Sequence, residues 1–267
     1  MNEYIHGYNN KEAIRLKDQA SALDKLLHHD SIWPDGSLIL EAGCGVGAQT
    51  KIIAPKNIKS QFISIDISSV SIKLAEELTN SLGITNVKYK QADVFNLPFN
   101  NDHFDHVFVC FVLEHLTDPV KALTELKRVI KPGGSIMVVE GDHGSAYFYP
   151  ESKVAQKAIQ CQVELQKQNG GDANIGRKFY PLLNQSGFYN VNISPRMVYV
   201  NDSNPNLVEG FTINTSTAMI EGIAEAAVLN KLISNEQMTK GIKDLYKTAE
   251  GGGTFCYTFF KGIGKKK

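Results

Sequence analysis

Three glycines at alternate positions are the residues best suited to holding a ligand. Gly43, Gly45 and Gly47 follow the short apolar run 38–40, which suits a buried strand. Glycine has no Cβ and adopts positive φ, so the backbone can turn sharply there and a ligand can approach closely. A helix is expected over 48–54. A strand, a glycine loop and a helix in this order cradle a nucleotide-like ligand at the helix N-terminus.

Strands and helices alternate through residues 37–141, and this alternation positions the glycine loop. Apolar runs predict further strands at 62–66, 87–92, 104–112 and 136–140. Connections between such strands are right-handed crossovers, which give a parallel sheet with helices on both faces. Ligands bind where such strands end. The clusters expected at that edge are Gly43–Gly47, Asp66, Asp93, Phe111–His115 and Gly141–His143.

The remaining segments are expected to add helices and two more strands. Helical patterns occupy 11–30, 151–168, 178–185 and 205–250, and strand patterns occupy 191–200 and 254–261. The length of 267 residues suits one large domain.

The composition limits the classes of partner and the cellular compartment that we expect. Lys+Arg and Asp+Glu both total 28, and this balance argues against a nucleic-acid partner. The cysteines 44, 110, 161 and 256 lack metal-ligand or redox spacing, so no metal site is expected. The first residues lack the pattern of a signal peptide, and no apolar run has membrane-spanning length. We therefore expect a cytoplasmic protein without a membrane partner. The oligomeric state is left open.

Four motifs together resemble one enzyme family. The segment Glu41–Gly47 resembles the acidic-x-Gly-x-Gly-x-Gly signature of class I S-adenosylmethionine-dependent methyltransferases. Asp66 closes the second strand as in that family, Ala92-Asp93-Val94 resembles its adenine-site segment, and Pro132-Gly133-Gly134 resembles its turn before strand five. The combination covers about residues 37–141 and is more specific than any single motif.

The resemblance implies a fold and a division of the chain. It implies an α/β, Rossmann-like, doubly wound sheet of seven strands, mostly parallel with an antiparallel last strand, and helical lid insertions. The single domain divides into an N-terminal helical lid, 1–36, and a cofactor-binding core, 37–141. Substrate-lid insertions and strand six follow in 142–250, and the last strand and tail in 251–267.

The resemblance also implies which residues bind S-adenosyl-L-methionine. Asp66 would accept hydrogen bonds from both ribose hydroxyls, since a carboxylate has two oxygens that suit a vicinal diol. Asp93 and the Val94 amide would meet the adenine, with Ile67 and Leu97 against the ring. The implied set is Tyr8, Arg15, Glu41, Gly43, Cys44, Gly45, Asp66, Ile67, Asp93, Val94, Cys110 and Phe111.

Several of these residues have a plainer interpretation. Glu41 would either support the ammonium end of the ligand or brace the loop without touching it. Asp66 could instead cap a helix and Asp93 could serve a turn. Arg15 could pair with the carboxylate of the ligand or lie on a solvated helix face. Glu114 and His115 are better explained as capping the next helix than as catalysts.

Methyl transfer asks little of the protein beyond alignment. Holding the nucleophile and the methyl group in line supplies much of the acceleration. A general base helps only where the acceptor must lose a proton. His143 is the candidate base nearest the expected rim, ahead of His115 and Tyr147. A purely structural role is its alternative.

The acceptor is expected to be a small organic molecule in a closed pocket. Aromatic and apolar residues proposed to line that pocket are Tyr147, Phe148, Tyr149, Phe179, Tyr180, Phe211 and Met219. A protein or peptide acceptor is the alternative.

Two other functions compete with the methyltransferase interpretation. An NAD(P)-dependent oxidoreductase would show Gly-x-Gly-x-x-Gly, whereas Gly47 comes one position early and Ala48 takes the usual slot. The second is a protein that binds S-adenosylmethionine without catalysis.

Overall fold

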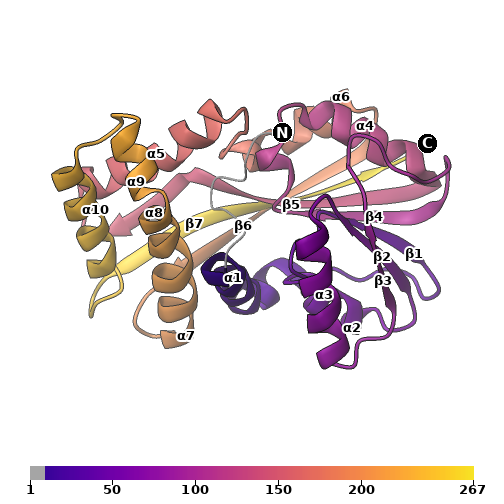
Figure 1. Ribbon diagram of the computed structural model, residues 1–267, viewed down its shortest axis with the longest axis horizontal. Helices are drawn as coiled ribbons and strands as arrows, with labels where there is room; N and C mark the ends of the chain where they lie inside the picture. Colours follow the sequence, from indigo (N-terminus) through magenta and orange to yellow (C-terminus); the bar gives the residue numbers. More distant parts are fainter. Residues whose placement is uncertain (1–9) are drawn as a thin grey trace.

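A single seven-stranded sheet forms the centre of the molecule (Figure 1). The structure, a computed structural model, describes residues 10–267, without several side chains early in the first helix. The sheet has the order β3-β2-β1-β4-β5-β7-β6. Its strands are β1 Leu38–Ala42, β2 Gln61–Asp66, β3 Val87–Gln91, β4 Phe104–Cys110, β5 Ile130–Tyr149, β6 Tyr189–Val200 and β7 Thr254–Lys265. β7 runs antiparallel to both neighbours, and the other pairs are parallel. The predicted fold class is confirmed.

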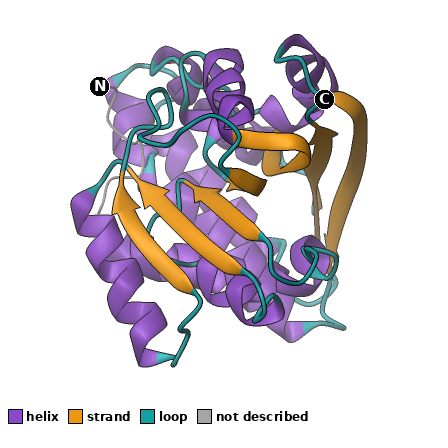
Figure 2. Ribbon diagram, turned by 90° about the vertical axis from the view of Figure 1, so that its right-hand side faces the viewer, coloured by secondary structure: helices purple, strands orange, loops and turns teal. Residues whose placement is uncertain are grey.

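Helices cover both faces of this sheet. Figure 2 looks from the side of β1–β3 and shows the strands as a middle layer between helices. The helices are α1 Asn10–His28, α2 Thr50–Lys56, α3 Ser69–Ser81, α4 Pro119–Val129, α5 Lys153–Gln168, α6 Phe179–Gln185, α7 Pro205–Leu207, α8 Ala218–Gly222, α9 Ala224–Leu229 and α10 Asn235–Lys247. Two 3₁₀ turns, η1 Leu113–His115 and η2 Ile175–Lys178, and a π-helix, η3 Val208–Thr217, complete the set.

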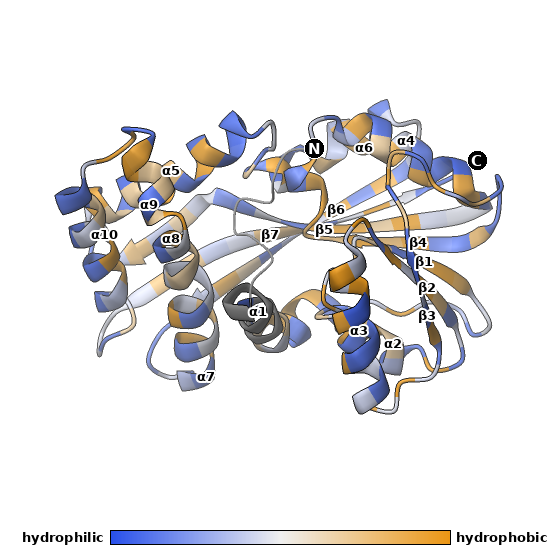
Figure 3. Cartoon of the chain, in the orientation of Figure 1, coloured by the Kyte–Doolittle hydropathy of each residue, from blue (hydrophilic) through white to orange (hydrophobic). Residues whose placement is uncertain are grey.

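Two apolar cores lie on opposite faces of the sheet. On one face, Leu23 and Leu27 of α1 and Ile53 of α2 belong to the same buried cluster as Phe108. On the other face, helices α4 and α6 pack against β4 and β5 through a second cluster. Figure 3 shows that apolar and polar residues alternate along α4, which covers one face of the sheet. None of the helices within residues 10–267 combines the length and apolar character needed to cross a membrane.

Three helices begin at residues whose side chains cap them. Ser68 caps α3 by accepting a hydrogen bond from the Ser71 amide. Asp118 caps α4, with Pro119 at the first helical position. Ser234 caps α10 in the same way as Ser68 caps α3. These side chains fix where the helices begin, and therefore where the preceding loops cross the sheet edge.

The fifth strand is much longer than its apolar run predicts. We expected it over 136–140, but β5 continues to Tyr149. Its far end pairs with β7, where Tyr147 lies opposite Cys256 after an irregularity that follows Asp142. Helices α5, α8, α9 and α10 pack around this extension, away from β1–β3 (Figure 1). Helices of the segment expected to form a lid therefore pack on the extended strands, and their role as a lid stays a prediction.

The strand geometry contradicts most of the proposed aromatic pocket. Side chains alternate between faces along a strand, so Tyr147 and Tyr149 point outward and are 71% and 62% exposed. Tyr180 is also exposed, while Phe179 is buried in the α4–α6 core. The other two aromatics, Phe148 and Phe211, pack into the α1-side core. Of the seven residues, Met219 alone lines the pocket described below.

Candidate functional site

The loop after β1 has the backbone conformation that glycine alone adopts easily. Gly43, Gly45 and Gly47 have φ of 75°, 51° and 78°. The amides of Gly43 and Cys44 both donate to the Ile65 carbonyl, at 2.8 and 2.9 Å. The loop is thereby held against the end of β2, as the sequence predicted.

The three glycines meet different surroundings. A Cβ on Gly43 would lie 2.3 Å from Cγ2 of Val112, and one on Gly47 would lie 3.1 Å from Cα of Ala75. A Cβ on Gly45 would meet nothing within 4 Å. Gly43 and Gly47 are thus required by packing within the protein. Gly45 presents bare backbone to open space, which fits close approach by a ligand.

Glu41, which precedes the glycine loop, is hydrogen-bonded to Thr50, which follows the loop, and to Ser64 of β2. It is 2% exposed, and its Oε2 accepts hydrogen bonds from Ser64 at 2.6 Å and Thr50 at 2.8 Å. Burial raises the pKa of Glu41 to about 7, although these two hydroxyls oppose the shift. The bracing role is therefore observed, and contact with a ligand stays a proposal.

Asp66 links the glycine loop to the next helix. Its Oδ2 accepts from the Gly45 amide and its Oδ1 from the Ser68 amide, both at 2.9 Å. The α3 cap is the Ser68 hydroxyl. Burial raises the pKa of Asp66, against the effect of its amide donors. Each carboxylate oxygen retains acceptor capacity, so a diol remains compatible with the half-buried side chain.

The predicted adenine residues lie beside Asp66. The Ala92 amide donates to the Asp66 carbonyl at 3.0 Å, which brings Asp93 and Val94 to the same rim. Asp93 is exposed, and its Oδ1 accepts from the Phe95 amide at 2.9 Å, so the turn role is observed. Ile67 is 44% exposed and available to a ligand.

Leu97, which was proposed to contact the adenine ring together with Ile67, is buried in the protein core. It is 4% exposed and belongs to the core on the α4 side. Two further proposed cofactor residues lie at the end of β4. Cys110 is buried at the end of β4, and Phe111 is half-buried just beyond it.

A buried acid that the sequence did not single out shapes the end of β4. The strand stops at Cys110, because Phe111 has φ of 58°. Oε1 of Glu140 then accepts from the Val112 and Leu113 amides, at 2.8 and 2.7 Å. Burial raises the pKa of Glu140 well above its ordinary value, and the charge of Glu114 adds to this effect. The signal available in the sequence was the position of Glu140 directly after the apolar run 136–139.

Helix α1 lies next to the glycine loop. Its Ala20 packs with Val46 and Ala48 of the loop. Arg15 is half-buried, and its Nη1 donates to Oε1 of Gln19 at 3.2 Å. Tyr8 lies outside the described residues, so the proposed contact of Tyr8 with a ligand stays a prediction.

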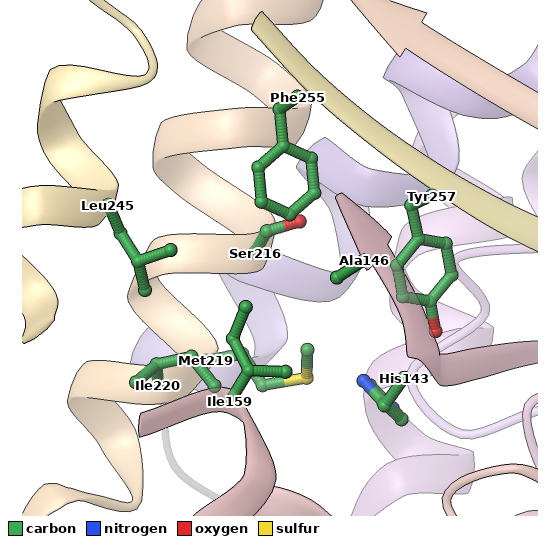
Figure 4. A pocket seen from close by; sticks show the side chains of 9 residues that line it. All are labelled: His143, Ala146, Ile159, Ser216, Met219, Ile220, Leu245, Phe255 and Tyr257. Atoms are coloured by element: carbon green, nitrogen blue, oxygen red, sulfur yellow. The ribbon is translucent and has the colours of Figure 1, made fainter. Parts of the chain in front are cut away.

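His143 lies in a pocket beyond the end of β4 (Figure 4). It comes from β5 and is 7% exposed. Its neighbours come from β5, β7, α5, η3, α8 and α10, and are mostly apolar. They are Ala146, Ile159, Ser216, Met219, Ile220, Leu245, Phe255 and Tyr257. The pocket contains about 290 Å³ of space between atoms, but the centre of a water molecule can occupy only about 20 Å³ of it. A larger ligand therefore needs the helices to move apart.

The other candidate bases fit less well. Tyr147 points away from the pocket and is exposed, so that proposal is wrong. His115 is half-buried, and its Nε2 lies 3.6 Å from Oε1 of Glu114. Burial raises the pKa of Tyr257, which keeps that phenol protonated at neutral pH. Of the three candidate bases, His143 alone lines the pocket.

The described residues contain no cluster of three or more histidine, cysteine or acidic side chains arranged to hold a metal ion. None of the pocket residues carries a fixed charge. The site thus combines an open rim, rich in backbone donors and carboxylates, with an adjoining apolar pocket that holds one imidazole.

Comparisons with known proteins agree with this arrangement. Residues 40–138 match the family model described as a methyltransferase domain. An uncharacterised methyltransferase of Schizosaccharomyces pombe, C1B3.06c, is 35% identical over 146 residues, which make up 52% of each chain. The ubiquinone/menaquinone biosynthesis C-methyltransferase UbiE of Idiomarina loihiensis is 26% identical over 79% of this chain and 73% of its own.

Solved structures share the fold. The phosphoethanolamine N-methyltransferase 2 of Haemonchus contortus, in complex with S-adenosylhomocysteine, aligns with a TM-score of 0.57 at 19% identity. That alignment covers 93% of this chain and 53% of the other. The chain therefore carries a methyltransferase domain of the class I S-adenosylmethionine-dependent type. This decides against the NAD(P)-dependent alternative. The match to the fission-yeast relative spans about half of that protein's length.

Proposed function

We propose that this chain transfers a methyl group from S-adenosylmethionine to a small, uncharged and largely apolar acceptor. The observation that carries the proposal is the apolar pocket of His143, whose Nε2 lies 3.5 Å from Oε2 of Glu114, just beyond the end of β4. S-adenosylmethionine, when bound, supplies a methyl group that is already activated for displacement.

The residues of the rim fit such a ligand. Gly45 offers open backbone, and Asp66 offers acceptor capacity for the ribose. Asp93 and Val94 would contact the adenine, with Ile67 beside it. The remaining proposed contacts are Arg15, Glu41, Gly43, Cys44, Cys110, Phe111 and, outside the described residues, Tyr8.

The lining of the pocket supports an uncharged acceptor. A phosphate or carboxylate would need a cation, and a quaternary or protonated amine would favour an aromatic cage or an anion. The pocket offers aliphatic groups, Ser216, two aromatic rings at Phe255 and Tyr257, and one imidazole, but no side chain with a fixed charge. A ring-bearing acceptor, as the name of the Idiomarina relative suggests, agrees with these surroundings.

Calorimetric titration with S-adenosylmethionine and S-adenosylhomocysteine tests the first half of the proposal. We expect micromolar binding to the native chain and at least a tenfold loss in Asp66→Ala, since two or more hydrogen bonds to a ligand diol are removed. Retained affinity in that variant would refute the ribose contact. A screen of phenols, hydroquinones and charged amines then tests the acceptor. Binding without methylation of any of them would favour the non-catalytic alternative.

A further inference from the structure

Glu114 contacts His143 from outside the pocket lining. Oε2 of Glu114 lies 3.5 Å from Nε2 of His143. Catalytic hydrogen bonds are often long before substrates bind and tighten in the complex. Glu114 is 8% exposed and contributes no atom to the pocket lining. It therefore acts on the imidazole and not on a ligand.

Both residues are anchored by the same segment of chain. The Gln166 amide donates to Oε2 of Glu114 at 3.1 Å and to its carbonyl at 2.9 Å. The Asp172 amide donates to that carbonyl at 2.8 Å, and the His143 amide donates to the Ala173 carbonyl at 3.0 Å. The end of α5 and the loop after it thus fix the relative position of the carboxylate and the ring.

The charge on Glu114 is maintained by its neighbours. Burial alone would raise its pKa, but the rings of His115 and His143 and the Gln166 amide together lower it below the ordinary value. Glu140, close to Glu114, shifts in the opposite direction. Carboxyl groups whose environments separate their pKa values in this way mark acid and base roles in enzymes. Here one carboxylate stays ionised beside the imidazole, while the other stays protonated.

The ring plane of His143 is set by a second contact. The Tyr257 ring meets it edge-on, with centroids 5.7 Å apart and planes 75° from parallel. Nε2 of His143 faces Glu114, and Figure 4 shows a ring nitrogen turned into the pocket. With a proton on Nε2 directed at Glu114, the lone pair of the other nitrogen, Nδ1, would face the pocket.

We infer that Glu114 is a positioning residue that makes His143 a general base, and that the acceptor is a weak acid such as a phenol or an enol. This inference rests on the proposed methyltransferase function. The acceptor proton passes to Nδ1 of His143 while the acceptor's electron pair forms the bond to the methyl carbon. The electrons of the broken carbon–sulfur bond remain on sulfur, and the imidazolium later releases its proton to water.

The orientation of the ring can be tested without any acceptor. Nitrogen NMR of the full chain, labelled with ¹⁵N-histidine, reports which nitrogen of His143 carries the proton, and the His143→Gln variant assigns the signal. We expect the Nε2–H form in the native chain. A native ring protonated at Nδ1 would overturn the inference. This result is independent of whether the chain transfers methyl groups, and it stands even where a Glu114 variant fails to fold.

Kinetics with an acceptor that the native chain methylates test the catalytic consequence. Glu114→Gln keeps the shape but removes the charge, so we expect kcat to fall by about 100-fold with KM nearly unchanged. Glu114→Asp restores the charge and should recover about a tenth of native kcat or more. The exposed Glu76→Gln on α3 is the matched control and should behave like the native chain.

Each variant is also titrated with S-adenosylhomocysteine. Unchanged affinity in Glu114→Gln would show that the loss of kcat does not come from the cofactor rim. Native kcat in Glu114→Gln, or a loss confined to KM, would overturn the inference. Failure of the proposed function itself would appear differently, as absence of methylation by the native chain.

Discussion

Alanine at Gly43 should destabilise the fold far more than alanine at Gly45. Both positions have positive φ, which costs an L-residue about 1–2 kcal/mol. At Gly43 the new Cβ also lies 2.3 Å from Cγ2 and 3.0 Å from Cγ1 of Val112. Overpacking of this kind costs about 1–3 kcal/mol. We therefore expect Gly43→Ala to lower the free energy of unfolding by about 2–5 kcal/mol, and Gly45→Ala by about 1–2 kcal/mol.

For ligand affinity we expect the opposite order, with the larger loss in Gly45→Ala. Gly45 faces open space, so a methyl group there intrudes on the expected ligand and not on the protein. Urea unfolding measures the stabilities, and similar m-values would show that the denatured states are comparable. Calorimetry with S-adenosylhomocysteine, under conditions where both variants are folded, measures binding. The reasoning is refuted if Gly43→Ala is no less stable than Gly45→Ala, or if Gly45→Ala binds as tightly as the native chain.

Two further predictions concern buried charges. Burial raises the pKa of Glu41 from 4.5 to about 7, so the folded state binds an extra proton between these values. The resulting stability is complete below about pH 4.5 and is lost as the pH rises through 7. As the pH rises from 4.5 to 8, the free energy of unfolding of Glu41→Gln should therefore increase by about 2–4 kcal/mol relative to that of the native chain, as measured by urea unfolding. A stability difference that does not change with pH would contradict this. Lys261→Met should lower the free energy of unfolding by about 1–3 kcal/mol. The buried ammonium group of Lys261 donates hydrogen bonds to Asp30 and to the Leu27 carbonyl, and these bonds are lost, although Asp30 stays partly solvated. The exposed Lys59→Met is its control, and equal stability of the two variants would refute the argument.

The sequence was most informative where local chemistry decides the structure. The glycines require positive φ, Ser68 and Asp118 cap helices through their own side chains, and apolar runs identify β1, β2 and β4. Each of these signals is read within a few residues. The parallel direction of these strands then follows from the crossover connections, and so a common edge with Asp66 could be predicted, whereas the order of the strands could not.

The extension of β5 could not be read in the same way. Residues 141–145 are small or polar, and nothing in their local pattern favours a strand. Their conformation depends on pairing with β7, more than 100 residues later. The prediction of the aromatic pocket was wrong for the same reason, because Tyr147 and Tyr149 lie on this extension and their side chains point to solvent. Glu114 was interpreted as a helix cap, since its contact with Gln166 joins segments that no sequence spacing brings together.

The course of the chain between β6 and β7 has a consequence for how acceptor preference can change. Val200, the last residue of β6, pairs with Phe255 at the start of β7. Residues 201–253 therefore leave the sheet and return to it at the same rung. This excursion supplies Ser216, Met219, Ile220 and Leu245 to the pocket. It forms one contiguous segment outside the sheet, and it packs on α1 through η3. Substitutions confined to this segment can therefore reshape the acceptor pocket while leaving the sequence of the glycine loop unchanged.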